Sequence, residues 1–380
     1  MSKRTLTFFI ALITCQMAFA QVSDLEFIRE QHLRAGMHFK TWGFEKESGL
    51  DRFTEFAFPV TYSLPVNRRF SIDFVTSPFF STLSPIAGNS ESFNSLSDSY
   101  IRTSYILGDN LAIINFGASL PSGKTKLDAE ELEIAGIAAN RPLDNPVSNL
   151  GTGVNLNFGL AIAQKLGAWV LGIGAGYAYR GEFDVIDIEA DTTASIEPGD
   201  EFNLTLGIDR DFELQNGKAK LIADLVYTTY RKDDLANLSR SPVFEAGDKI
   251  VAQARFLFPL AAFKPVMLTL RNRWRLNNKS NNAALIDNGN ELELGVNLFH
   301  PVTERLQFKY LLDSKFYSNT VNDSEGAVVF GIGLGVDYGF SQHVAIDPSI
   351  KFSKGKINTG PGTDVGIAGL EFSIGLAFTF

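Results

Sequence analysis

A basic stripe is the part of this sequence with the most distinctive chemistry. In the stretch 266–276, arginine occupies three alternate positions, with Leu270, Asn272 and Trp274 at the positions between or beside them. Side chains alternate between the two faces of a β-strand, so these guanidinium groups share one face. Guanidinium groups bind carboxylates and phosphates through paired hydrogen bonds, which indicates an anion site or a charge filter. With an arginine of the same parity in the preceding stretch, the basic stripe consists of Arg255, Arg271, Arg273 and Arg275.

The same pattern allows a structural role for the basic stripe. Glu291 and Glu293 have the parity of the arginines, and the intervening hairpin brings them beside Arg273 and Arg275. Opposite charges on neighbouring strands stabilise a sheet by about 0.2–1 kcal/mol per pair. The sequence is therefore compatible with two roles for the basic stripe: its arginines are neutralised by the two glutamates, or they select anions.

The basic stripe belongs to a pattern that repeats along the chain from about residue 35. Each unit is a stretch of strict alternation followed by a turn or a loop. In 169–180, for example, Trp169 and Ile173 share one face, whereas Gly172 and Gly174 lie on the other. The repetition predicts an all-β fold, an antiparallel up-and-down transmembrane β-barrel of about 16 strands, with about 14 or 12 as alternatives. The predicted strands are 35–45, 53–64, 70–77, 100–107, 111–120, 150–162, 169–180, 202–212, 220–230, 250–258, 266–276, 291–299, 306–316, 327–339, 344–353 and 366–380.

Two kinds of connection alternate between these stretches. One kind is short, as in 108–110 and 164–167; the other is long and polar and comprises 78–98, 121–148, 183–200, 231–247 and 277–290. Short periplasmic turns alternating with long outer loops are typical of outer-membrane barrels. Aromatic residues near the predicted strand ends fit the two membrane interfaces; they include Trp42, Trp169, Tyr62, Tyr105, Tyr317 and Tyr338. A soluble β-sandwich, which also alternates, is the alternative fold.

The N-terminus has the features of an export signal. Lys3 and Arg4 precede an apolar run over 6–17, and the small-residue triplet Ala18-Phe19-Ala20 follows it. This order of charge, apolar run and small residues predicts a cleavable signal peptide. The predicted organisation is a signal peptide at 1–20, a periplasmic N-terminal extension at 21–34 and the barrel at 35–380.

The composition argues against several functional classes. The formal net charge of −9 becomes −11 when Lys3 and Arg4 leave with the signal, since the first twenty residues contain no acid. Such an acidic chain is unsuited to nucleic acid, whose phosphates require a basic face. Cys15 leaves as well, so the mature chain has no thiolate or disulfide chemistry. None of the four histidines stands in a catalytic pattern with serine and aspartate, and we expect no enzyme, metal or cofactor.

The last eight residues carry a family resemblance. They alternate in the order Ser373-Ile374-Gly375-Leu376-Ala377-Phe378-Thr379-Phe380 and end on an aromatic residue. This segment resembles the C-terminal assembly signal of Gram-negative outer-membrane proteins. The resemblance implies insertion by the barrel assembly machinery into the outer membrane, among lipid and lipopolysaccharide. A second segment, Gly117-Ala118-Ser119-Leu120-Pro121-Ser122-Gly123, looks like a strand end of transporters of the phenol-degradation meta-pathway or hydrocarbon-uptake kind, which implies a hydrophobic substrate.

The loop 121–148 carries four acids in a short stretch compatible with a helix. In position, length and charge it is similar to the third loop of sixteen-stranded general porins, which folds into the lumen and sets acids against a basic wall. The resemblance implies a constriction between this loop and the basic stripe; an exposed, solvated loop is the alternative. The predicted constriction residues are Asp128, Glu130, Glu131 and Glu133.

These observations predict an outer-membrane channel or transporter for passive permeation of small solutes through a polar, partly charged lumen. A barrel that takes up a hydrophobic small molecule is one alternative. A non-conducting structural or adhesive outer-membrane protein is another. Assembly into a homo-oligomer is compatible with each of them.

Overall fold

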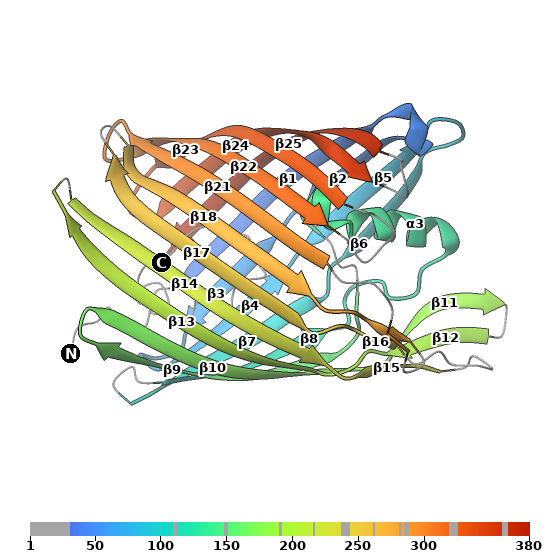
Figure 1. Ribbon diagram of the computed structural model, residues 1–380, viewed down its shortest axis with the longest axis horizontal. Coiled ribbons are helices and arrows are strands. Elements are labelled where there is room, and N and C mark those ends of the chain that lie inside the picture. The colour runs from blue at the N-terminus through green and yellow to red at the C-terminus, as the bar shows by residue number, and fades with distance from the viewer. Residues whose placement is uncertain are drawn as a thin grey trace.

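The computed structural model describes residues 31–108, 112–147, 151–189, 192–215, 217–236, 244–260, 263–280, 283–284, 289–318, 326–358 and 364–380. Most of these residues belong to one antiparallel sheet that closes into a barrel (Figure 1). The predicted signal peptide, and the predicted extension up to residue 30, lie outside the described residues. The first strand begins at His32, inside the predicted extension. Among the described residues, no helix is long and apolar enough to cross a membrane.

The barrel has sixteen strands among the described residues, as the alternation predicts. Three of the sixteen are each interrupted once, so that they consist of β2 with β3, β4 with β5, and β6 with β7. In order around the barrel, the strands are β1 (His32–Phe44), β2 (Leu50–Ala57) with β3 (Val60–Pro65), β4 (Phe70–Thr76) with β5 (Pro78–Pro85), β6 (Glu91–Leu96) with β7 (Ser99–Leu107), β8 (Ala112–Leu120), β9 (Asn155–Leu166), β10 (Trp169–Arg180), β13 (Glu201–Leu214), β14 (Gly217–Tyr230), β17 (Lys249–Leu260), β18 (Phe263–Arg275), β21 (Gly289–Pro301), β22 (Leu306–Ser318), β23 (Gly326–Gly339), β24 (Val344–Asn358) and β25 (Asp364–Thr379).

The last strand closes the barrel on the first. β25 pairs antiparallel with β1 along the whole of β1, from His32 opposite Thr379 to Phe44 opposite Ile367. Within the described residues, every barrel strand therefore has a partner on both sides, and the barrel sheet has no open edge. A closed sheet is the one β structure that satisfies its backbone polar groups within hydrocarbon.

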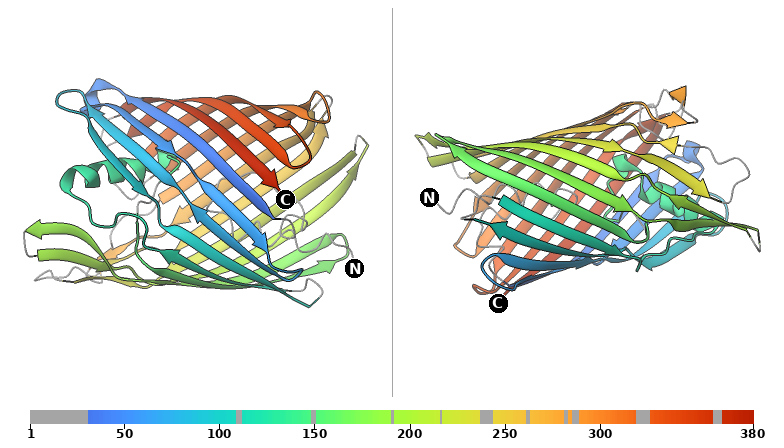
Figure 2. Two further views of the ribbon diagram at one scale, coloured as in Figure 1. Left: turned by 180° about the vertical axis from the view of Figure 1, so that it is seen from behind. Right: turned by 90° about the horizontal axis from the view of Figure 1, so that it is seen from below.

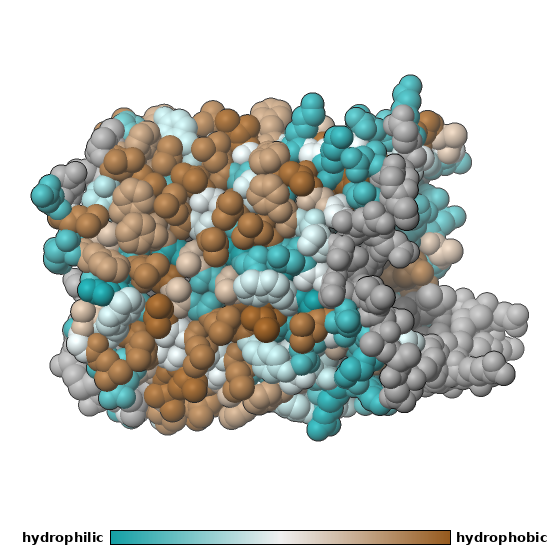
Figure 3. Space-filling model, in the orientation of Figure 1, coloured by the Kyte–Doolittle hydropathy of each residue, from teal (hydrophilic) through white to brown (hydrophobic). Residues whose placement is uncertain are grey.

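The apolar face of the sheet points outward. On β23, Phe330, Ile332 and Leu334 are 55–61% exposed, while the intervening Gly331 and Gly333 face the interior beside charged or polar neighbours. Apolar residues cover much of the barrel wall in Figure 3, with hydrophilic residues toward its ends. This inside-out distribution contradicts a soluble sandwich, which would bury its apolar face, and it is the distribution of a lipid-facing barrel.

Three neighbouring strands are interrupted at the same level along the barrel axis. Two of the resulting strand segments, β5 and β6, lie in 78–98, where a long connection was predicted. That segment is not a loop, because β5 and β6 continue the wall. The interruptions fall at Pro59, Ser77 and Ser97, and backbone hydrogen bonds cross them: Gly36 N donates to Pro59 O at 2.8 Å and Ser97 N to Ser77 O at 2.9 Å. Proline has no backbone N–H to continue a ladder, so Pro59 accounts for the first break.

A small second sheet extends beyond one end of the barrel. It consists of β11 (Phe183–Glu189), β12 (Thr192–Glu197), β15 (Lys232–Ala236), β16 (Phe244–Glu245), β19 (Lys279–Ser280) and β20 (Ala283–Ala284). These strands lie within three of the predicted long connections, and in Figures 1 and 2 they project from the end opposite the C-terminus. We call this end the loop end and the opposite one, with the short connections, the turn end.

Candidate functional site

The connection from β8 to β9 folds into the barrel, and we call its described residues 121–147 the inner loop. It contains helix α3 (Ala129–Ala138) and the 3₁₀ turn η2 (Arg141–Leu143). The helix begins with a capping box, in which Asp128 Oδ1 accepts from Glu131 N at 2.9 Å and Glu131 Oε2 accepts from Asp128 N at 3.2 Å. The acidic stretch of the sequence is thus helical, because its first acids satisfy the free N–H groups of the helix start.

Helix α3 packs on the inner face of the wall. Ile134 and Ala138 on the helix are 1% exposed and contact a cluster of apolar side chains that point into the barrel at the loop end. The wall contributes Phe53, Ala57, Phe79, Leu83 and Phe93, from β2, β5 and β6, to this cluster. Burying these groups holds the helix against one arc of the barrel.

The tip of the inner loop is bound to another part of the wall. Leu143 is 1% exposed and its carbonyl accepts a hydrogen bond from Trp42 Nε1 at 3.0 Å, while Tyr317 OH donates to Arg141 O at 3.3 Å. The placement of Trp42 and Tyr317 at a membrane interface is therefore wrong, since both lie inside. Their parity with Lys40 and Lys315, which also point inward, was the signal for this.

The inner loop crosses the lumen. It leaves the wall at β8, the fifth strand around the barrel, and its tip is bound to β22, the thirteenth. In a ring of sixteen strands these two are diametrically opposite. The loop therefore spans the barrel from wall to wall near its loop end, and Figure 2 shows α3 within the outline of the barrel.

Lysines of the wall hold the tip of the inner loop. Lys315 Nζ lies 2.5 Å from Asp144 Oδ2, and Lys40 Nζ donates to the Asp144 carbonyl at 2.6 Å. Glu371 bridges Lys40, at 3.2 Å, and Lys351, at 3.5 Å. Enclosure in the barrel by itself raises the pKa of Asp144, but the three lysines outweigh it and hold that pKa well below its usual value. Asp144 is thus ionised and fixed at neutral pH.

The basic stripe is partly neutralised. Arg273 and Arg141, the latter from the inner loop, both bind the carboxylate of Glu291. Arg271 binds Glu293 at 2.6 Å. In the strand register, Arg271 pairs with Glu293 and Arg273 with Glu291, which shifts the predicted neighbours by one pair along the strand.

The remaining members of the basic stripe differ from these two. Arg255 lies opposite Thr269 on β18, and Arg275 lies opposite Lys249 on β17. Among the described residues, the Nε atom of Arg275 is buried without a hydrogen-bond partner. The stripe therefore combines arginines that are paired with acids and an arginine, Arg275, whose Nε has no hydrogen-bond partner in the described part of the chain.

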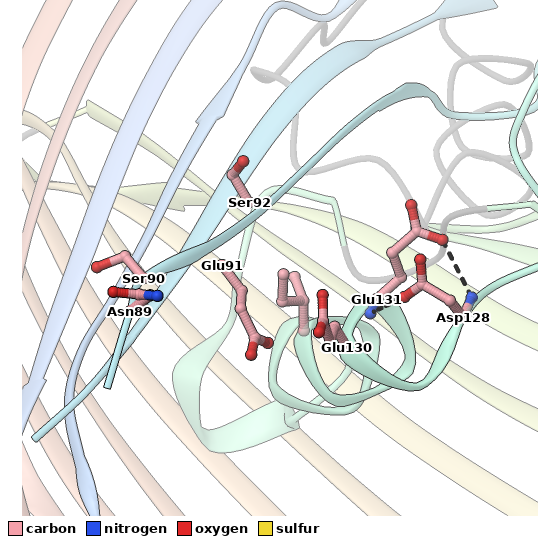
Figure 4. A pocket seen from close by; sticks show the side chains of 8 residues that line it. Asn89, Ser90, Glu91, Ser92, Asp128, Glu130 and Glu131 are labelled. Atoms are coloured by element: carbon pink, nitrogen blue, oxygen red, sulfur yellow. Dashed lines mark hydrogen bonds between the residues drawn. The ribbon is translucent and has the colours of Figure 1, made fainter. Parts of the chain in front are cut away.

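The four acids of the inner loop face a different region from the basic stripe. Three of them, with Glu91 and Ser92 of β6, line a pocket between α3 and the β5–β6 hairpin (Figure 4). Lys124 binds Glu131 at 2.5 Å. The inner-loop residues that contact the basic stripe and its acids are instead in η2. The four residues that were predicted to form a constriction with the basic stripe, and that face this other region, are Asp128, Glu130, Glu131 and Glu133.

The glycines on the inner face of β23 make room for charged side chains. A Cβ at Gly331 would lie 2.4 Å from Asp313 Oδ1, and one at Gly335 would lie 3.0 Å from the Lys309 side chain. Lys309 binds Asp337 at 2.8 Å and also binds Asp347. These glycines thus accommodate the ion pairs of the neighbouring strands. One predicted stretch needs correcting, since β9 begins at Asn155 and not at residue 150.

The outward-facing Asn272 has a partner. It is 9% exposed, and its Nδ2 donates to Asn290 Oδ1 at 2.8 Å, on the neighbouring strand β21. Asn272 and Asn290 therefore form an asparagine pair on the outer face of the barrel. A partner on another strand was not visible in the local pattern.

No family model matches the chain, and no curated protein matches its sequence. Several solved structures have a similar fold. A bacterial polysaccharide outer membrane secretin matches 91% of this chain and 98% of its own, at 6% identity and a TM-score of 0.44. OprB of Pseudomonas putida matches 93% of this chain and 96% of its own, at 9% identity and a TM-score of 0.42. The CymD monoaromatic hydrocarbon channel matches 92% of this chain and 88% of its own, at 12% identity and a TM-score of 0.40.

Similarity at this level concerns the fold alone. The class of the protein follows from its own features: sixteen paired strands, an apolar outer face, a charged interior and a loop folded across the lumen. Together they make this chain a membrane-spanning β-barrel of the outer-membrane type.

Proposed function

We propose that this chain is an outer-membrane channel through which small solutes permeate passively, along a polar lumen that the inner loop narrows. The observation that carries the proposal is the course of the inner loop, which crosses the lumen from β8 and is fixed on β22 by Tyr317 and Lys315. Many charged and amide groups line the interior, which requires water between them. A fixed loop in a wet lumen limits the size and charge of the solutes that pass.

The proposed passage follows the arc of the wall away from the contacts of the inner loop. Those contacts fall on β1, on β2, β5 and β6, and on β21, β22 and β23. The other arc, from β9 to β18, has polar groups on its inner face. There Gln253 donates to Asp224 at 2.9 Å, and Arg255 lies beside them. These groups would keep water in the passage.

We place the barrel in the outer membrane, with lipid and lipopolysaccharide around its apolar wall. The outward exposure of Tyr105 and Tyr338 near strand ends supports this placement. The barrel assembly machinery is the proposed partner for insertion, because β25 alternates to its end and is followed by Phe380. No catalytic step is part of the proposal.

Conductance in a planar bilayer tests the proposed function. The purified mature chain should give stepwise currents in KCl, and replacing residues 129–146 by a short Gly-Ser linker should enlarge each step. If neither protein conducts, the channel proposal is wrong.

Uptake of a hydrophobic molecule is the second candidate. The two apolar clusters that seal the inner loop against the wall favour it, because they would block a passage on that side. This candidate would be supported if the full chain gave no current while the variant with residues 129–146 replaced by the linker did conduct.

A further inference from the structure

Four cations gather inside the loop end of the barrel. Arg273 and Arg275 are on β18, Lys249 is on β17, and Arg141 reaches them from the tip of the inner loop. We call Arg141, Lys249, Arg273 and Arg275 the outer basic cluster. It lies where a solute entering from the loop end would pass between the inner loop and the uncovered arc of wall.

The strand register brings the members of the outer basic cluster together. Lys249 pairs directly with Arg275 across β17 and β18, and Arg273 is two residues from Arg275 on the same face. Arg141 and Arg273 share the carboxylate of Glu291. The four side chains thus form one electrostatic unit from three separate segments.

The acids nearby do not balance these charges. In the described part of the chain, Glu291 is the acid that ion pairs join to the outer basic cluster, and Glu201, opposite Tyr230 on the neighbouring strand, is a second acid close to Lys249. Four cations thus lie near two carboxylates. Glu201, the next acid along the wall, is bound by Arg180 at 2.5 Å. Lys249 instead lies 5.7 Å from the centre of the Tyr230 ring. The surplus is unusual in a chain of net charge −9.

We propose that the outer basic cluster is a binding site for small organic carboxylates passing through the lumen. The inference rests on the proposed channel function for its role, and it adds the class of solute. Glu291 shows how the site holds its ligand, since its carboxylate lies between Arg141 and Arg273. Arg275 and Lys249 offer a solute carboxylate a second pair of cations beside that one.

A fixed carboxylate next to an excess of cations suits transport. The guanidinium group of Arg275 and the ammonium of Lys249 attract an anion into the narrow part of the lumen, and Glu291 competes with that anion for Arg141 and Arg273. Binding is then favourable enough for entry and weak enough for release, which is the condition for conduction. The inner loop supplies one donor, Arg141, so its position sets the size of the anion that fits.

Calorimetric titration of the full mature chain in detergent tests the site, with sodium succinate as the probe. We expect saturable binding of succinate and none of the neutral succinamide. The double variant Lys249→Gln/Arg275→Gln should bind succinate about tenfold more weakly or worse, since charge-assisted hydrogen bonds are lost. Heat-dependent migration on gels verifies that each variant is folded.

A matched control removes two other lumen cations. Arg102, which binds Asp73 at 2.7 Å, and Lys309, which binds Asp337 at 2.8 Å, are on other parts of the wall. Arg102→Gln/Lys309→Gln makes the same change in net charge and should leave succinate binding within about twofold of wild type. The charge-retaining variant Lys249→Arg/Arg275→Lys should keep most of the affinity.

Three results overturn the proposal: no saturable binding of succinate to the wild type, equal succinate affinity in wild type and Lys249→Gln/Arg275→Gln, or an equal loss in the control variant. The binding assay needs no ion flow, so it separates this inference from the channel function. A chain that binds succinate and never conducts contradicts the channel function alone. A chain that conducts and shows no saturable succinate binding contradicts the carboxylate site alone.

Discussion

Lys315 of β22 lies 2.5 Å from Asp144, at the tip of a loop that begins on the opposite side of the barrel. The pair joins two segments that are 171 residues apart in sequence. It is one of the contacts that fix the inner loop across the lumen, together with Trp42 and Tyr317. The width of the passage therefore depends on interactions at a single tip.

Loosening this tip should widen the channel. Because Asp144 is 54% exposed to the interior, we expect the ion pair to contribute only about 1 kcal/mol, enough to raise the frequency of wide openings severalfold in Asp144→Asn. Single-channel recording measures this. Glu213→Gln, which removes an exposed pair with Lys218 at the turn end, is the control and should leave the openings as they are.

Acid should loosen the same contact. The lysines around Asp144 lower its pKa in the folded protein, so the ionised carboxylate favours docking of the inner loop. The contribution of the Asp144 carboxylate to docking is complete at a pH above 3.8, the ordinary pKa of an aspartate. It is lost as the pH falls below 3.8 towards the lowered pKa of the folded protein. Wide openings should thus increase below about pH 4 in wild type. Asp144→Asn should lack this step, and an identical acid response in both proteins would assign it to another group.

A methyl group added at Gly369 should push the Trp42 ring out of its position. A Cβ on Gly369 would lie 2.7 Å from the Trp42 ring, which is 1% exposed and has no room to move. Gly369→Ala should destabilise the folded barrel by about 1–3 kcal/mol, the usual cost of overpacking. Urea unfolding in lipid vesicles measures the loss. The control is Gly159→Ala, where the nearest atom is an ordinary 3.8 Å away; a comparable loss there would contradict the steric explanation.

The asparagine pair on the outer face gives a coupling prediction. Asn290→Leu removes the shorter of the two hydrogen bonds that Asn272 Nδ2 donates and leaves the longer one, to Glu291 O at 3.3 Å, so it should cost about 0.5–1.5 kcal/mol. Asn272→Leu/Asn290→Leu removes both amides and should recover most of the stability. The double-mutant cycle is measured by unfolding in vesicles, and additive losses would show that the two amides act independently.

Removing the last residue separates assembly from stability. Phe380 is 69% exposed and makes one backbone hydrogen bond, from its N–H to Gln31 O at 2.9 Å. Its deletion should slow insertion in cells while the refolded barrel keeps its unfolding midpoint. Outer-membrane fractionation and unfolding of the refolded protein measure the two effects. Normal insertion of the truncated chain would argue against recognition of Phe380 by the barrel assembly machinery.

Period-two alternation was sufficient to find part of every strand of the barrel wall. It located a segment of each of the sixteen strands because one face of each strand must be apolar to contact lipid. It failed for β5 and β6, where Phe79, Leu83 and Phe93 point inward to contact α3 and reverse the usual distribution. A local pattern cannot show that another segment of the chain covers the inner face.

The site was less predictable than the wall. Parity placed Arg271, Arg273, Glu291 and Glu293 on the inner face, where they form two ion pairs. The residue that completes the arrangement, Arg141, lies 150 residues from Glu291 in sequence. Its position depends on the length and course of the inner loop, which carry no periodic signal.

The anchors of the inner loop impose an order on assembly. Its tip is held by Lys40 and Trp42 on the first strand and by residues on β21 and β22, late in the chain. These two groups become neighbours only after β25 has paired with β1. The inner loop therefore reaches its final position last, so a barrel that has not yet joined its ends lacks its constriction.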